Sequence, residues 1–271
     1  MCVPAHDSWV HHMRSVIKGP FMFVLLESPN HDCGFNFGRF NHVFNWTITY
    51  RRDSDLVLNY GGFEPVSGGN DFNPARINLK RKLVFWLVNH KGSPGGRDRY
   101  VHELEKHIKV HKHGGGTGNH CPPETRTLYG WECKAKLSKQ YKFYLAFENS
   151  VCKDYATEKF YDVMKYDVVP VVYGLANYSA LAPPHSYIDV RDFKSPKALG
   201  EYLTYLDKND EEYLKYFKWR ENYRVTDLRV AINKVLCDMC ERVNHMEELR
   251  KTAHSAEELE LWWRGTQKDR T

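Results

Sequence analysis

The stretch from Tyr141 to Gly174 constrains the fold more than any other part of the sequence. It reads YKFYLAFENSVCKDYATEKFYDVMKYDVVPVVYG. Residues 141–147 form an apolar run that predicts a strand, a helix is predicted to open around residues 155–159, and residues 168–173 predict a second, β-branched strand. Two strands joined through a helix pair in parallel. The stretch therefore predicts an α/β fold with a mainly parallel sheet.

Polar residues gather where the first of these strands ends and the helix begins. Glu148, Asn149 and Ser150 follow the strand directly, and Lys159 lies in the first turn of the predicted helix. A lysine in this position is unfavourable by itself, because a helix N-terminus already carries partial positive charge. A bound anion would make it favourable, and a diphosphate is the obvious candidate. In doubly wound sheets, ligands bind at this kind of junction.

The same stretch resembles the donor-binding motif of the α1,3-fucosyltransferases, the tenth family of glycosyltransferases. The matching phrases are YKFYLAFENS, CKDYATEK and VPVVYG. Further matches are LLESP (25–29), FNWTITYRRDSD (44–55), SPGGRDRYVHEL (93–104), LAPPHSYIDVRDF (181–193) and YLTYLDKNDEEYLKYFKW (202–219). Motifs of this length are far more specific than a short pattern. The resemblance implies the GT-B fold, in which two Rossmann-like domains face each other across a cleft.

Three segments are predicted along the chain. Residues 1–80 are expected to form a partial N-terminal acceptor-side domain, residues 81–250 a C-terminal GDP-fucose-binding Rossmann-like domain, and residues 251–271 a charged tail. Because the family pattern starts in mid-domain, the N-terminal domain is expected to be incomplete and the chain to be a fragment, an incomplete gene model or a degenerate copy. Residues 111–123 read HKHGGGTGNHCPP and predict a flexible loop.

Composition and charge argue against two classes of partner. The longest apolar runs, residues 21–26 and 83–88, are far shorter than the about 20 residues of a membrane helix. The net charge of +5 comes from dispersed basic residues without a recognised nucleic-acid module, so no nucleic-acid partner is expected. The family consists of type II Golgi membrane proteins. The resemblance thus implies the Golgi lumen and the Golgi cisterna membrane, with the membrane reached only through an anchor absent from this chain.

The resemblance also assigns the donor site. Its donor-binding positions fall on Arg97, Asn149, Tyr155, Thr157, Glu158 and Lys159. Arg97 and Lys159 are expected to stabilise the departing diphosphate, and Arg99 is the alternative if the register is shifted. Glu158 is expected to hold the ribose hydroxyls. Without the resemblance, these residues would be ordinary surface, packing or turn residues, and the loss of Lys159 is expected to leave the fold intact.

Glu27 is the candidate catalytic base. It follows an apolar strand, so its carboxylate is expected to be half-buried with a raised pKa. The family's proposed base lies in the same Glu-Ser-Pro segment, although by itself Glu27 would be an ordinary loop glutamate. The implied reaction is inverting transfer of L-fucose from GDP-fucose, in α1,3 linkage, to GlcNAc of a glycoprotein glycan. The acceptor stays open between terminal LacNAc and the innermost GlcNAc of N-glycans.

Two other functions are consistent with the sequence. One is a non-catalytic or truncated remnant of such an enzyme that binds GDP or glycan. The other is a metal-dependent GT-A enzyme, because Asp53 and Asp55 form an Asp-x-Asp triplet that can share a hard cation. The resemblance makes this triplet structural or acceptor-lining. It implies that no cofactor is required, with Mn²⁺ or Mg²⁺ as a stimulant at most.

Cysteine and asparagine positions give further expectations for a secreted fold. Of the seven cysteines, Cys237 and Cys240 are disulfide candidates, either with each other or with cysteines outside this chain. Their spacing lacks the second Cys or His pair of a zinc site, so no metal is expected there. Asn45 and Asn177 stand in N-glycosylation triplets.

Overall fold

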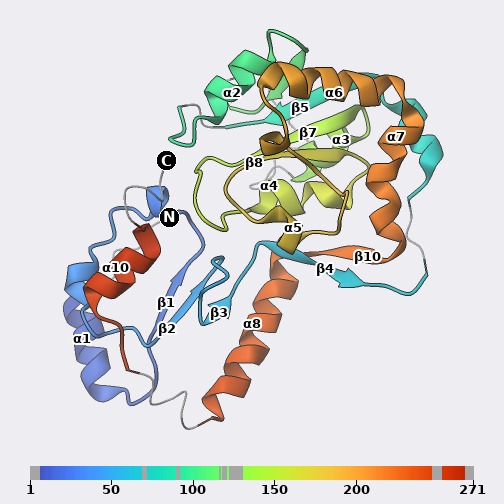
Figure 1. Cartoon of the computed structure of the whole chain (residues 1–271). Coiled ribbons are helices and arrows are strands. Elements are labelled where there is room, and N and C mark those ends of the chain that lie inside the picture. Colours follow the sequence, from blue (N-terminus) through green and yellow to red (C-terminus); the bar gives the residue numbers. More distant parts are fainter. Residues whose placement is uncertain are drawn as a thin grey trace. The chain divides into compact units, whose positions relative to one another are not determined.

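The computed structural model of the chain describes residues 7–68, 72–89, 92–115, 117, 121, 131–245 and 252–265. The chain divides into two units, each with its own parallel sheet (Figure 1). Unit 1 comprises Met1–Tyr60, Val151–Tyr155 and Leu228–Thr271. Unit 2 comprises Gly61–Ser150 and Ala156–Asp227.

The main sheet of unit 2 has five parallel strands in the order β6-β5-β7-β8-β9. These strands are β5 (Lys82–Leu87), β6 (Val110–His113), β7 (Tyr141–Phe147), β8 (Val169–Tyr173) and β9 (Ile188–Asp189). In chain order this is the 2-1-3-4-5 arrangement of doubly wound sheets, and the strand order reverses between β5 and β7. The α/β fold with a mainly parallel sheet is thus confirmed.

Helices cover both faces of this sheet (Figure 1). They are α2 (Arg97–Leu104), α3 (Trp131–Ser138), α4 (Glu158–Tyr161), α5 (Tyr178–Leu181), α6 (Pro196–Lys208) and α7 (Asp210–Leu214). Alternate side chains of β7, from Phe143 to Phe147, pack with Val101 of α2 and Leu203 of α6 in one buried cluster. α3 and α4 also contact β7. Every residue of β7 is buried, as expected for a parallel strand covered on both faces.

Ser195 caps α6, because its hydroxyl accepts a hydrogen bond from the Ala198 N–H and Pro196 is the first helical residue. The predicted loop at residues 111–123 is wrong at its start. There β6 forms the edge strand, and His111 pairs with Phe85 of β5. The loop was predicted from the glycines that follow. The start of this segment is nevertheless a strand, because it pairs with β5. Residues 116, 118–120 and 122–123 of the predicted loop lie outside the described ranges.

A two-stranded antiparallel ribbon completes unit 2. It joins β4 (Gly61–Pro65) to β10 (Tyr223–Asp227), which lie at opposite ends of the unit's sequence. The register pairs Phe63 with Val225. Residues 61–80 were predicted to belong with the N-terminal domain, but this ribbon places them in unit 2.

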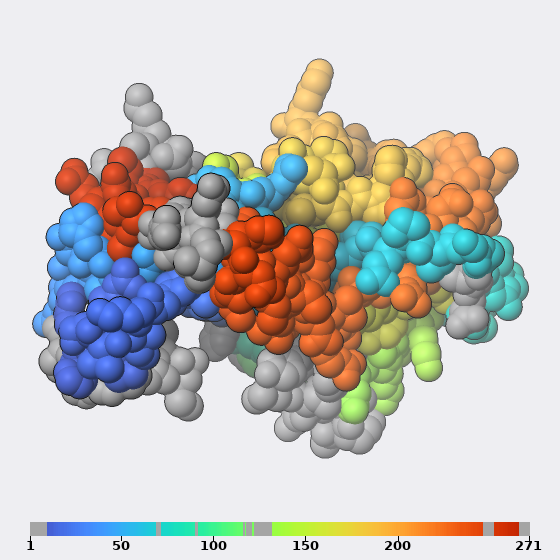
Figure 2. Space-filling model, turned by 90° about the horizontal axis from the view of Figure 1, so that it is seen from below, coloured from blue at the N-terminus to red at the C-terminus, as the bar shows by residue number. Residues whose placement is uncertain are grey.

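Unit 1 is built on a three-stranded parallel sheet in the order β1-β2-β3. Its elements are α1 (Asp7–Val16), β1 (Met22–Leu25), β2 (Trp46–Thr49), β3 (Leu56–Val57), α8 (Leu228–Val243) and α10 (Ala256–Arg264). Met22 packs in a cluster with Val235 of α8, whereas Phe23 packs in a second cluster with Trp263 of α10. Neighbouring strand residues point to opposite faces, so these helices cover different sides of β1. The outer surface of α8 is the orange-red ridge in Figure 2.

The C-terminal part of the chain differs from the prediction. Residues 228–250 were expected in the donor domain, but α8 packs in unit 1. The predicted charged tail contains α10, which begins with a capping box between Ser255 and Glu258. Its Leu259 and Trp263 are buried. Because α10 has few apolar positions, its sequence alone gives no clear signal of a buried helix. The helix is stabilised by the cluster that covers these positions.

Cys237 and Cys240 are not bonded to each other, and their pairing with cysteines outside this chain stays a prediction. A disulfide joins Cys121 to Cys133, whose Cα atoms lie 5.7 Å apart, and Cys33 is also disulfide-bonded. Cys237 and Cys240 are free, exposed thiols on α8. Residues three apart on a helix diverge by about 60° around its axis, which opposes a direct bond between them. Within the described ranges, no helix has the length and apolar character to cross a membrane.

Candidate active site

The reversal of strand order in unit 2 creates the candidate site. Where neighbouring parallel strands connect to opposite faces, the loops at their carboxyl ends separate and leave a crevice. Here the loop after β5 leads to Arg97, and the loop after β7 carries Glu148 and Asn149. The Gly95 N–H donates a hydrogen bond of 3.2 Å to the Asn149 carbonyl. Two segments that the sequence assigned to the donor therefore lie side by side.

Arg97 is fixed at the start of α2. The preceding Gly96 has φ of 73°, a left-handed conformation that glycine adopts without strain. The Arg97 side chain is buried, and its Nη1 donates to the Phe147 carbonyl at 2.9 Å. Its guanidinium carbon lies 5.6 Å from the centre of the Trp86 ring. Arg99 is exposed, so the geometry favours Arg97 over the alternative register.

A buried carboxylate organises the turn before α4. Glu148 is 0 % exposed and accepts hydrogen bonds from the Thr157 N–H at 2.8 Å and from the Thr157 hydroxyl at 2.9 Å. Thr157 also caps α4, whose first residue is Glu158. The Lys159 Nζ lies 3.1 Å from Glu148 Oε2 and donates to Thr157 Oγ1 at 2.8 Å. Lys159 is therefore the counter-ion of Glu148.

The charges of this network act on one another. Burial raises the pKa of Glu148, against the influence of Lys159. Burial lowers the pKa of Lys159, but Glu148 and Glu158 outweigh it, so that this pKa is raised and the ammonium stays charged. The positive charge of Arg97, by contrast, lowers the pKa of Lys159. The two predicted phosphate ligands therefore share one electrostatic environment.

Glu158 remains a carboxylate in the same environment. Burial opposes its ionisation, but Lys159 and Lys134 lower its pKa below the ordinary value. The Lys159 Nζ lies 3.3 Å from Glu158 Oε1. A charged carboxylate beside the helix start can accept hydrogen bonds from ligand hydroxyls.

Asn149 presents an acceptor without a partner. Its Oδ1 is buried and makes no hydrogen bond in the described part of the chain. A buried acceptor left in this way costs about 1–3 kcal/mol. A ligand N–H or O–H at this position would remove that cost.

Glu148 is the site residue that sequence reasoning missed. It was noted only as one of three polar residues after the strand, although it holds both Thr157 and Lys159. The available signal was a glutamate directly after a fully apolar strand, where burial demands a counter-ion. Loss of Lys159 is therefore expected to destabilise the fold rather than leave it intact, because the loss would leave a buried carboxylate without its cation.

Glu27 and Tyr155 form a separate pair within unit 1. Glu27 lies two residues after the end of β1 and is exposed, so the expected half-buried carboxylate is wrong. The Tyr155 hydroxyl donates to Glu27 Oε2 at 3.2 Å. Tyr155 itself is buried, with its ring centre 4.9 Å from that of Tyr50 in an edge-on contact. Tyr155, predicted as a donor ligand, thus positions the predicted base.

Both carboxylates of the Asp-x-Asp triplet in unit 1 accept hydrogen bonds from other groups of the protein. Asp53 accepts hydrogen bonds from Arg51 Nη2 at 2.7 Å and from Lys153 Nζ at 2.9 Å. Burial opposes the effect, but both cations hold the pKa of Asp53 below its usual range. Asp55 accepts from the Thr47 N–H at 2.9 Å and from its hydroxyl at 3.0 Å. These bonds support the structural interpretation of the triplet.

The two glycosylation candidates differ in accessibility. Asn45 is buried, and its Oδ1 accepts a hydrogen bond of 3.0 Å from the Phe21 N–H. A glycan on this side chain would have to displace that packing, so Asn45 is a poor acceptor in the folded chain. Asn177 is exposed at the start of α5.

Comparisons with known proteins agree with this geometry. The fold resembles that of an α1,3-fucosyltransferase crystallised with GDP-fucose, with a TM-score of 0.56 and 18 % identity over 81 % of this chain and 73 % of that one. The fold is of the GT-B type. Residues 77–262 match the model of the glycosyltransferase family 10 (fucosyltransferase) C-terminal region, and residues 7–61 match the fucosyltransferase N-terminal model. The chain therefore belongs to glycosyltransferase family 10.

Two relatives illustrate the family. The glycoprotein 3-alpha-L-fucosyltransferase A of Drosophila melanogaster is 38 % identical over 94 % of this chain and 50 % of its own length. The human 4-galactosyl-N-acetylglucosaminide 3-alpha-L-fucosyltransferase FUT6 is 36 % identical over 88 % of this chain and 67 % of its own length. The chain thus spans half of the first relative and about two thirds of the second.

Proposed function

We propose that this protein is an inverting α1,3-fucosyltransferase, which transfers L-fucose from GDP-fucose to GlcNAc of glycoprotein glycans. The observation that carries the proposal is that both cations contact the carboxyl end of β7, at the strand-order reversal of the parallel sheet: Arg97 donates to the Phe147 carbonyl, and Lys159 pairs with Glu148. Relatives named as 3-alpha-L-fucosyltransferases and membership of family 10 support the same activity.

Arg97 and Lys159 stabilise the leaving group in this proposal. As the bond from fucose C1 to the diphosphate breaks, negative charge builds on the phosphate oxygens. Arg97 offers a planar fork for two of these oxygens, and its contacts with Phe147 and Trp86 hold it in place before the reaction. Lys159 adds a point charge near the same oxygens. Glu158 accepts hydrogen bonds from the ribose hydroxyls of GDP-fucose, and the Asn149 side-chain amide forms a hydrogen bond with GDP-fucose.

Glu27 acts as the base. It removes the proton from the GlcNAc 3-hydroxyl, whose oxygen attacks fucose C1 from the face opposite the diphosphate and inverts the configuration. The Tyr155 hydroxyl holds the carboxylate through Oε2 and leaves Oε1 for the acceptor. No step requires a metal ion, and Mn²⁺ or Mg²⁺ remains a stimulant at most.

We place the complete protein in the Golgi lumen, at the cisterna membrane. The Cys121–Cys133 disulfide supports an oxidising compartment, and the exposed Asn177 supports exposure to the glycosylation machinery. The glycan acceptor stays open between two classes. The fruit-fly relative is named for glycoproteins and the human one for 4-galactosyl-N-acetylglucosaminide, so this choice needs a direct test.

Transfer of labelled fucose tests the proposal. The purified chain would be incubated with GDP-[¹⁴C]fucose and either LacNAc or an N-glycan core acceptor. We expect label on one of these acceptors. If neither is labelled while calorimetry shows GDP binding, the remnant interpretation replaces the enzyme. If no transfer occurs and calorimetry shows binding of neither GDP nor the two acceptor glycans, both interpretations are wrong.

A further inference from the structure

A hollow of about 680 Å³ lies at the edge of the unit 2 sheet opposite the candidate active site. Lys80 precedes β5, Ser138 precedes β7 and Asp167 precedes β8, and all three line the hollow. These residues mark the amino ends of parallel strands, whereas the active-site loops leave the carboxyl ends. The hollow is therefore separate from the donor site.

Positive charge dominates the lining. Five cationic side chains line the hollow, namely Arg76, Lys80, Lys139, Lys165 and Arg220. The acidic residue in the lining is Asp167. It is already engaged, by Arg76 Nη1 at 3.2 Å and by Arg220 Nη1 at 3.0 Å. Lys165 also has acidic partners, Asp227 at 3.8 Å and Asp162 at 4.0 Å. Five cations therefore face three carboxylates, an excess of two positive charges.

Lys80 is a buried cation held only by neutral groups within the described chain. It is 7 % exposed, and its Nζ donates to the backbone carbonyls of Ser138 and Tyr141. Burial lowers its pKa to about 8, and Asp167 opposes this shift. Burying an ammonium without a partner of opposite charge is unfavourable. An anion in the hollow would supply that partner.

Two polar atoms of the lining residues also have unused hydrogen-bonding capacity. The Ser138 hydroxyl and the Arg220 Nε are buried and make no hydrogen bond within the described ranges. Ser138 is 1 % exposed and Arg220 is 8 % exposed. A hydroxyl and a guanidinium are the groups that bind oxyanions through charge-assisted hydrogen bonds.

We propose that this hollow binds a phosphate or sulfate group, either as the free ion or as an ester on a sugar. The charge excess and the buried Lys80 ammonium carry this assignment, and the Ser138 hydroxyl and the Arg220 Nε become further donors when these side chains turn toward the hollow. The volume exceeds that of a single ion and lies in the range of small-molecule pockets. The binding does not depend on fucosyl transfer, so the two proposals can fail separately.

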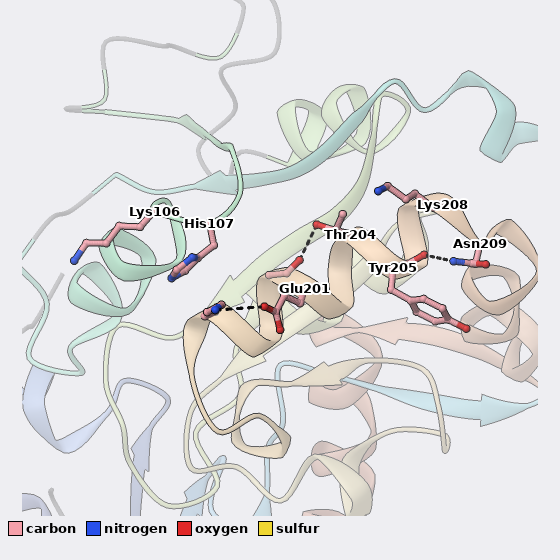
Figure 3. Close-up of a pocket in the computed structure, with 9 residues that line it drawn as sticks. Lys106, His107, Glu201, Thr204, Tyr205, Lys208 and Asn209 are labelled. Atoms are coloured by element: carbon pink, nitrogen blue, oxygen red, sulfur yellow. Dashed lines mark hydrogen bonds and ion pairs between the residues drawn. The ribbon is translucent and has the colours of Figure 1, made fainter.

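A second hollow, of about 530 Å³ between α2 and α6, differs in character (Figure 3). Two of its three lysines have acidic partners at the surface, because Lys106 pairs with Glu103 at 2.7 Å and Lys197 pairs with Glu201 at 3.8 Å. The Thr204 hydroxyl donates to the Gly200 carbonyl at 2.8 Å. A solvated basic surface of this kind supports no ligand assignment.

Isothermal titration with sodium sulfate, against sodium chloride at matched ionic strength, tests the proposal. We expect sulfate-specific 1:1 binding that weakens by about five-fold or more in Ser138→Ala, which removes a hydroxyl without a described partner. Lys139→Glu should weaken binding further, and the surface control Lys194→Glu should not. Binding should persist in Arg97→Lys, which changes the donor site.

The source of the group is distinguished by a second titrant. N-acetylglucosamine 6-sulfate binding at least about ten-fold more tightly than sulfate would assign a sugar ester, and equal affinities would assign the free ion. Absence of sulfate-specific binding would overturn the proposal. So would equal losses in Lys139→Glu and Lys194→Glu, because a general charge effect would then explain them.

Discussion

The pairing of Lys159 with Glu148 leads to a prediction that separates stability from catalysis. In Lys159→Met the buried Glu148 loses the cation that lies 3.1 Å away. Breaking a buried ion pair from one side costs about 3–5 kcal/mol. Because the Lys159 side chain is 22 % exposed, water can replace part of its effect. We therefore expect the free energy of unfolding to fall by about 2–3 kcal/mol at pH 7.5.

The same variant should also lose transfer activity. Removing one charge-assisted contact to the departing diphosphate costs about 2–4 kcal/mol of transition-state stabilisation. This corresponds to a drop in kcat/KM for GDP-fucose of about 30- to 1000-fold. Urea unfolding gives the stability loss, and initial rates with labelled GDP-fucose give the activity loss.

A double variant distinguishes the two effects. Glu148→Gln combined with Lys159→Met removes both charges, so most of the lost stability should return while the activity stays low. Lys194→Met, at an exposed position, serves as the matched control and should unfold like the wild type. An unchanged urea midpoint in Lys159→Met, or recovered activity in the double variant, would refute the reasoning.

The stability loss of Lys159→Met should also depend on pH. Burial raises the pKa of Glu148 above its ordinary value of 4.5, and the positive charge of Lys159 counteracts this rise. In Lys159→Met that counteracting charge is missing. Below that ordinary value Glu148 is protonated in both the folded and the unfolded chain, so its ionisation costs no stability there. As the pH rises through the raised pKa, the folded chain must bury the charge. The difference from wild type should therefore grow as the pH rises above the ordinary value of 4.5 and level off once the pH exceeds the raised pKa.

Three further predictions concern the other candidate residues. Tyr155→Phe removes the hydroxyl that holds Glu27, so kcat should fall by about five- to thirty-fold with a shifted pH profile, while calorimetry shows unchanged GDP affinity. EDTA should leave residual transfer activity, and its complete abolition would support a metal site at the Asp-x-Asp triplet instead. On expression in a secretory host, Asn177→Gln should lose a glycan by mass spectrometry and Asn45→Gln should not, because Asn45 is buried.

Local sequence signals were sufficient for the central strand and its polar loop. β7 is an uninterrupted apolar run, and the same run of sequence supplies Thr157 as helix cap and Lys159 in the first turn. The family resemblance added Arg97, whose burial beside Phe147 has no local signal. These features could be predicted because each depends on neighbouring residues or on a long motif.

Long-range contacts account for what the sequence did not predict. β10 pairs with β4 across more than half of the chain, and α10 depends on a cluster that includes Phe23. The Tyr155–Glu27 bond joins residues 128 positions apart. Glu148 was visible in the sequence, but its role depends on the turn that returns Thr157 and Lys159 to it. No periodicity or spacing encodes that turn.

Titration of GDP into wild type, Arg97→Lys and Arg99→Lys tests the central claim most directly. Both substitutions keep the charge, and both positions lie on α2, but only the first replaces a buried guanidinium at the strand-order reversal. We predict 1:1 binding to wild type, an affinity about ten- to a hundred-fold lower in Arg97→Lys, and no change in Arg99→Lys. Equal affinities in all three proteins, or no binding of GDP to wild type, would contradict a donor site built on Arg97.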